Sequence, residues 1–173
     1  MTPVTRLFGL PPLVSADTRL LVLGSFPGAA SLAAQQYYGH PQNQFWRILQ
    51  AIYASSPYSI GERSYENRSK WMLARGVGLW DVYASCERKG SLDAKIRNAE
   101  VNDLKALRQR CPQLRAVAHN GAESFRHAGK LEDGDLPTVR LPSTSPAHAS
   151  WSFERKLAAW RDVFEQFGLI NGP

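Results

Sequence analysis

The stretch Leu20–Trp46, LLVLGSFPGAASLAAQQYYGHPQNQFW, decides the fold because an apolar run and a polar loop follow each other directly in it. Its first residues, Leu20–Leu23, form a continuous apolar run, which is typical of a strand buried on both faces. The run ends in the turn Gly24–Gly28, GSFPG, whose glycines let backbone N–H groups approach a ligand closely. Open α/β sheets bind ligands at the carboxyl ends of their strands. The stretch therefore predicts a strand with a binding loop at its end.

Apolar runs and amphipathic stretches alternate along the rest of the chain. Three further strands are expected, at Val77–Val82, Leu114–Ala118 and Pro137–Leu141. Alternating strands and helices imply a parallel sheet that is covered on both faces. We therefore predict an α/β fold, a three-layer α/β/α sandwich with a central, mostly parallel four-stranded sheet. Five helices are expected. One begins at Gln44, and another begins near Val101 with Asn98 or Asn102 as its cap. The other three cover Tyr65–Ala74, Ala122–Ala128 and Ser152–Phe167.

Two segments of the sequence lack a regular spacing of apolar residues. Met1–Thr18 contains Pro3, Pro11 and Pro12, so it is interpreted as a lead-in that lies over the fold. Ser85–Asn98 is the longest irregular candidate, and long loops in compact domains tend to be functional.

Composition limits the class of protein. With 173 residues, 43% apolar and 21% charged, the chain is expected to form a single globular domain over residues 1–173. The net charge of +6 permits a polyanionic partner without requiring one. Cys86 and Cys111 lack the spacing of a zinc or iron–sulfur site, so no metal or cofactor is expected. No apolar run is long enough for a membrane span, and we expect a cytoplasmic monomer without an obligate protein partner.

Several separated motifs resemble the uracil-DNA glycosylase superfamily, and in particular its hypoxanthine-DNA (deoxyinosine) glycosylase branch. The motifs occur in order over nearly the whole chain, so the resemblance implies one domain of this type with residues 1–18 as its lead-in. They are GSFPG at Gly24–Gly28, HPQNQFW at His40–Trp46, GLWDV at Gly78–Val82, Asn120-Gly121, and LPSTSPAH at Leu141–His148.

The resemblance implies that Asn43 is the catalytic residue. A neutral amide can orient a water molecule and hydrogen-bond a base without adding charge. On spacing alone Asn43 is better interpreted as a helix N-cap, and the surrounding motif reverses that preference. Phe26 stands where mismatch-specific relatives, with GINPG, have their catalytic asparagine. That difference favours a base other than uracil.

Other site residues are assigned by motif and by position at the strand ends. Phe45 is expected to stack on an extruded base, and Trp46 to lie in the core. Asp81 is expected to support base or water binding, with local backbone capping as the alternative. The expected base-binding set is Gly24, Ser25, Phe26, Phe45, Asp81 and Asn120. The expected DNA-binding set is Tyr37, Tyr38, His40 and the loop Ser143, Thr144, Ser145, Pro146, Ala147 and His148, which resembles the loop that enters the minor groove.

The function implied is that of a monofunctional DNA glycosylase in base excision repair, acting on DNA that contains a deaminated base. It would hydrolyse the N-glycosidic bond of deoxyinosine, release hypoxanthine and leave an abasic site. Neither of the two main motifs contains a lysine that could form a Schiff base. The alternatives are a mismatch-specific uracil- or xanthine-DNA glycosylase, a non-catalytic nucleic-acid-binding domain, and a nucleotide- or flavin-binding domain, although no GxGxxG follows the first strand.

Overall fold

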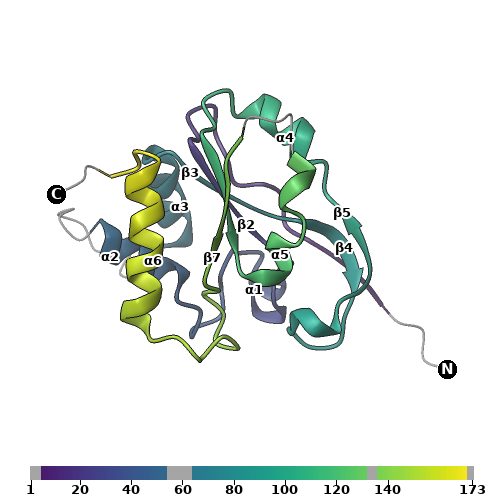
Figure 1. Ribbon diagram of the computed structural model, residues 1–173. Helices are drawn as coiled ribbons and strands as arrows, with labels where there is room; N and C mark the ends of the chain where they lie inside the picture. The colour runs from purple at the N-terminus through teal and green to yellow at the C-terminus, as the bar shows by residue number, and fades with distance from the viewer. Residues whose placement is uncertain (1–4, 54–63, 132–135, 171–173) are drawn as a thin grey trace.

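The computed structural model describes residues 5–53, 64–131 and 136–170, and its central feature is a parallel sheet of four strands (Figure 1). The strand order is β3-β2-β6-β7, and every neighbouring pair is parallel. This confirms the predicted central sheet. Its strands are β2 (Leu20–Gly24), β3 (Val77–Asp81), β6 (Ala116–Asn120) and β7 (Thr138–Leu141).

Strand β2 lies in the middle of this sheet, and all five of its residues are buried. Leu20 and Val22 belong to the apolar cluster on one face, and Leu21 and Leu23 to the cluster on the other. Side chains alternate between the faces of a strand, so a strand covered on both sides must be apolar at every position. The continuous run in the sequence is the result.

Three helices cover one face of the sheet, as Figure 1 shows on the left: α2 (Phe45–Ile52), α3 (Tyr65–Ala74) and α6 (Phe153–Gln166). Trp160 and Phe164 of α6 are fully buried against this face. Ser64 and Ser152 begin α3 and α6, because their side chains accept hydrogen bonds from the Asn67 and Arg155 N–H groups. The longest helix, α6, is held by apolar packing along its inner stripe. Among the described residues, no helix has the length and apolar character that a membrane crossing needs.

The opposite face is covered by short helices and by a second sheet (Figure 1). The helices are α1 (Ala29–Ala34), which was not predicted, α4 (Leu104–Arg110) and α5 (Ala122–Phe125), with a 3₁₀ turn η3 at Ala128–Leu131. Helix α4 begins later than expected, since the Asp103 side chain accepts from the Ala106 N–H at 3.0 Å. The predicted caps Asn98 and Asn102 are therefore wrong, and Val101 lies in a strand.

The second sheet contradicts two expectations. It is antiparallel, in the order β1-β4-β5, with β1 at Arg6–Phe8, β4 at Tyr83–Glu87 and β5 at Arg97–Val101. The lead-in therefore contributes a paired strand, although residues 1–4 lie outside the described part. Most of the segment Ser85–Asn98 is a hairpin, irregular only at its tip, which holds the 3₁₀ turn η2 (Asp93–Lys95). Strand β5 is largely exposed, so no apolar alternation marked it in the sequence.

Candidate active site

A pocket of about 590 Å³ opens at the carboxyl ends of the parallel strands. Gly24 and Asp81 face each other across β2 and β3, and Asn120 ends β6 beside them. Parallel pairing places these three strand ends on one edge, as the sequence predicted. Every residue predicted for the site lines this pocket except Phe45.

Asn43 lies where helix α2 begins, next to the loop Ser143–His148. The backbone N–H of Gln44 donates to the Thr144 carbonyl at 3.0 Å, which joins the two distant segments directly. The Asn43 Oδ1 accepts from the Phe45 N–H, the first N–H of helix α2, at 3.0 Å, so this side chain is fixed at the helix start and also lines the pocket. That hydrogen bond leaves one lone pair of Oδ1 and the NH₂ group for a ligand or water.

Asn120 ties the two sides of the pocket together. Its Nδ2 donates to the Tyr38 hydroxyl at 3.1 Å and to Thr144 Oγ1 at 3.0 Å. Its Oδ1 accepts from the Thr144 N–H at 3.0 Å. Because both amide hydrogens are engaged, Asn120 has no free donor for a base. Its side chain instead holds Tyr38 and Thr144 together across the pocket.

The aromatic surface of the pocket belongs to Tyr38, which corrects the expectation for Phe45. Phe45 is completely buried, packed edge-on to Trp160 and underneath Tyr38, whose ring centroid is 4.4 Å away. Tyr38 lines the pocket and has a φ of 55°, a left-handed backbone conformation that is uncommon for such a residue. Trp46 was expected in the core; it is half-buried, packs against the core cluster and does not line the pocket.

Tyr37 is also placed differently from the prediction. Its side chain is 5% exposed, and its hydroxyl donates to the Pro11 carbonyl at 2.7 Å. The indole N–H of Trp46 donates to the Tyr37 carbonyl at 3.1 Å. A phosphate contact by this hydroxyl is therefore excluded, because Tyr37 fastens the N-terminal segment to the site instead.

Asp81 is the buried titratable group of the pocket. Burial raises the pKa of its carboxyl to about 7, with a further upward contribution from Asp93 and an opposing one from Arg88. The Oδ2 atom has no hydrogen-bond partner within the described residues. The absence of a side chain at Gly24 makes room for this carboxyl, since a Cβ there would lie 2.5 Å from Asp81 Oδ1.

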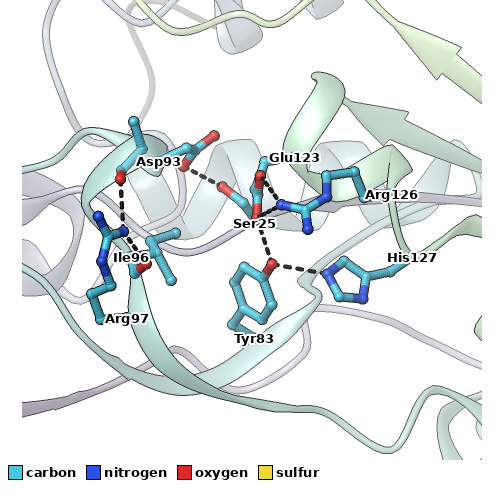
Figure 2. A network of polar contacts seen from close by, with 9 residues as sticks. Ser25, Tyr83, Asp93, Ile96, Arg97, Glu123, Arg126 and His127 are labelled. Carbon is cyan, nitrogen blue, oxygen red and sulfur yellow. Dashed lines mark hydrogen bonds and ion pairs between the residues drawn. The ribbon is translucent and has the colours of Figure 1, made fainter.

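Two more carboxylates, Asp93 and Glu123, line the same pocket and were not predicted as site residues. Figure 2 shows how both are held: Ser25 Oγ donates to Asp93 at 2.6 Å, and the Tyr83 hydroxyl donates to Glu123 at 2.6 Å. Among the described lining residues there is no lysine or arginine. The interior of the pocket therefore suits an uncharged ligand better than a phosphate.

Two basic residues next to the loops of the pocket are internal braces. Lys156 is 2% exposed and donates from Nζ to the His148 carbonyl at 2.6 Å. Arg88 is 7% exposed and donates from Nη2 to the Pro27 carbonyl at 2.6 Å. Each brace fixes one loop of the pocket. The exposed basic residues near the rim are Lys89, Lys95, Arg97, Arg140 and Arg155.

The loop Ser143–His148 is a fixed turn whose tip is exposed. Ser143 Oγ accepts from the Ser145 N–H at 3.1 Å, and Ser145 Oγ accepts from the Ala147 N–H at 3.2 Å. Pro146 and Ala147 are exposed. Burial and the nearby Lys156 lower the pKa of His148, which disfavours the charged form of its imidazole. The loop thus presents small side chains and backbone to the solvent.

Comparisons with known proteins agree with this architecture. Residues 11–165 match the family model described as the uracil DNA glycosylase superfamily. A hypoxanthine DNA glycosylase of Methanosarcina barkeri is 35% identical over 91% of this chain and 98% of its own length. A hypoxanthine DNA glycosylase of Methanosarcina acetivorans is 36% identical over 90% of this chain and 96% of its own. An NMR structure of a candidate uracil DNA glycosylase from Methanosarcina acetivorans has a TM-score of 0.83 and 33% identity, covering 95% of this chain and 99% of that one.

Proposed function

Because this chain belongs to the uracil DNA glycosylase superfamily, we propose that it is a monofunctional DNA glycosylase that removes hypoxanthine from deoxyinosine in base excision repair. The reaction hydrolyses the N-glycosidic bond and leaves an abasic site in an intact strand. The observation that supports it most is the junction of Asn43 with the loop Ser143–His148 at one pocket without cationic lining among the described residues.

Asn43 is the proposed catalytic residue. Cleavage of a base–sugar bond passes through an oxocarbenium-like transition state, which a water molecule must approach from the open face. The Asn43 side chain is fixed by its hydrogen bond to the Phe45 N–H, so its remaining polar atoms can hold that water in one position. Positioning of this kind requires no charge on the side chain.

Asp81 and the turn after β2 are proposed to assist the departing base. The base gains negative charge as the bond breaks, so hydrogen-bond donors around it lower the barrier. The backbone N–H groups of Ser25 and Phe26 donate to no acceptor among the described residues and border the pocket. Protonated Asp81 adds a further donor, because its Oδ2 has no partner there and its pKa is about 7.

Tyr38 is proposed as the stacking surface for the extruded base. A pocket of about 590 Å³ is within the usual range for small-ligand sites, roughly 300–1,000 Å³. Stacking on an aromatic ring contributes about 1–3 kcal/mol per base. The buried Lys156 amine is engaged with the His148 carbonyl, so no described lysine is positioned for Schiff-base chemistry and strand cleavage.

The proposed function is tested with an end-labelled duplex that carries a single inosine. After incubation with the protein, alkali breaks the strand wherever a base has been removed. We expect breakage at inosine only after alkali, and parallel duplexes with uracil or xanthine determine the substrate preference. A protein that binds these duplexes but releases none of the three bases would contradict the proposal.

The assignment of Asn43 needs a variant that keeps an acceptor for the Phe45 N–H. Asn43→Ser retains a side-chain oxygen but removes the amide, so we expect a folded protein with excision reduced about 10²-fold or more. Gln42→Ala is the matched control, since Gln42 is an exposed neighbour that does not line the pocket. Normal turnover by Asn43→Ser would refute the assignment of Asn43 while leaving the glycosylase proposal intact.

A further inference from the structure

The mouth of the pocket carries an exposed apolar side chain, Leu92. It is 52% exposed and lines the pocket from the tip of the β4–β5 hairpin. The other large apolar residues that are exposed in the described part, Phe8 and Val101, do not line the pocket. Leu92 is thus the exposed large apolar side chain of the described part that stands at the mouth of the pocket, where a DNA strand delivering a base must pass.

The segment that carries Leu92 is fastened by hydrogen bonds to the segment that follows β2. The Ala29 N–H donates to Ser91 Oγ at 2.9 Å, and Ser25 Oγ donates to Asp93 Oδ1 at 2.6 Å (Figure 2). The Lys95 N–H donates back to the Leu92 carbonyl at 3.0 Å. Residues on both sides of Leu92 are therefore anchored, and its side chain is presented at a fixed place on the rim.

The loop Ser143–His148 borders the same pocket and lies at the same end of the molecule (Figure 1). Its exposed tip, Pro146 and Ala147, offers only short side chains. A nucleotide that leaves a duplex opens a gap in the base stack, and extrusion costs a few kcal/mol unless something replaces the lost contacts. The short tip residues can replace only part of those contacts, whereas a leucine is among the side chains that proteins insert between base steps.

We propose that Leu92 is a wedge that enters the base stack beside the extruded nucleotide and stabilises the opened duplex. This inference rests on the proposed function, because it assigns the hairpin tip a role in delivering the base to the pocket. Lys89 and Lys95, three residues before and three after Leu92 in the chain, are exposed and can neutralise phosphates of the strand that the wedge enters. Leu92 acts on the DNA and does not take part in bond cleavage.

The wedge is tested with Leu92→Ala and with two readouts. The first is the fluorescence of 2-aminopurine placed next to the inosine, which rises when its neighbour is unstacked. The second is the single-turnover excision rate on duplex compared with single-stranded DNA. Val101→Ala is the matched control, since Val101 is also an exposed apolar residue of the hairpin but lies away from the pocket.

Wild type and Val101→Ala are expected to raise the fluorescence, whereas Leu92→Ala should not. Its excision rate should fall about tenfold on duplex and remain unchanged on single strands, and Leu92→Met should restore most of the loss. Equal fluorescence in wild type and Leu92→Ala would overturn the wedge, whatever the excision rates are. A fluorescence rise with wild type but not with Leu92→Ala, without release of any base, would refute the proposed function while supporting the wedge.

Discussion

The wall of the pocket that holds Asp81 and Asn43 differs in construction from the wall formed by Ser91–Ala94. On the first wall, Gly24 and Asp81 are buried in the parallel sheet, and Asn43 is fixed at the start of a helix. On the second wall every residue is exposed, and side-chain hydrogen bonds hold it to the turn after β2. We infer that the first wall provides a dry, fixed environment for chemistry, while the second is free to meet a duplex.

The largest effect is expected from disturbing the first wall at Gly24. In Gly24→Ala the new Cβ would lie 2.5 Å from Asp81 Oδ1, so the buried carboxyl must move. We expect excision to fall about 10²-fold, since displacements near 1 Å have such effects, and stability to drop by about 1–3 kcal/mol. Single-turnover assays and thermal unfolding measure the two effects.

Gly28→Ala is the control for this substitution. Gly28 lines the same pocket, but a Cβ there would meet Ser91 at 3.5 Å from Oγ and 3.6 Å from Cβ, which are ordinary contacts. It should keep nearly full activity. Wild-type activity in Gly24→Ala would mean that the position of the Asp81 carboxyl is unimportant for the reaction.

The second prediction concerns the protonation of Asp81. Its carboxyl can donate to the departing base only when neutral, and its pKa is about 7. The excision rate should therefore fall as pH rises through 7, by up to about tenfold per unit. Asp81→Asn keeps a donor at every pH, so its rate should be flat across this range. Identical pH profiles for wild type and Asp81→Asn would exclude this role.

The raised pKa of the Asp81 carboxyl also implies that the stability of the protein depends on pH. The carboxyl ionises at about 3.8 in the unfolded chain and at about 7 in the folded one, so the folded state binds the proton more tightly. Stability is therefore lost as pH rises from about 4 to 7, by at most about 4 kcal/mol for this group. Asp81→Asn should be more stable than wild type at pH 8, a comparison that urea unfolding provides.

A moderate effect on DNA binding is expected from removing the Lys156 amine, which holds the loop Ser143–His148 through the His148 carbonyl. Lys156→Met keeps the length of the buried side chain but removes its hydrogen bond to the His148 carbonyl. We expect duplex affinity to fall about tenfold because the loop Ser143–His148 is less well fixed, with little change in the unfolding free energy. Lys105→Met, on the exposed side of α4, should behave like wild type. Unchanged affinity in Lys156→Met would show that the loop does not need this brace.

The smallest effect is expected at the exposed wall. Removing Lys89 or Lys95, which are exposed next to the hairpin tip, should weaken binding to all sequences alike. Each substitution by alanine should reduce the slope of log affinity against log salt by about 0.9, because one phosphate contact is lost. Lys105→Ala serves again as the control. Salt slopes that do not change would place the duplex away from this wall.

Sequence patterns were sufficient to predict those strands and helices whose burial depends on the spacing of apolar residues within the element itself. The run Leu20–Leu23 predicted a strand buried on both faces, because only that environment accepts four consecutive large apolar side chains. The expected helix Tyr65–Ala74 has the bounds of α3, and the expected helix Ser152–Phe167 is one residue longer than α6 at each end. The hairpin of β4 and β5 was missed, since its pairing depends on partners far along the chain and β5 buries little surface.

The sequence by itself determined the parallel sheet, the position of its binding edge and the segments that meet there, because these follow from apolar periodicity and from the common direction of parallel strands. Only the tertiary structure decided which aromatic ring is available to a base. Phe45 is buried between Trp160 and Tyr38, which leaves the Tyr38 ring at the pocket. The neighbouring Tyr37 hydroxyl is held by the Pro11 carbonyl. Only the tertiary structure, likewise, placed Leu92 and Asp93 on the rim, since side-chain contacts between distant segments leave no periodic trace in the chain.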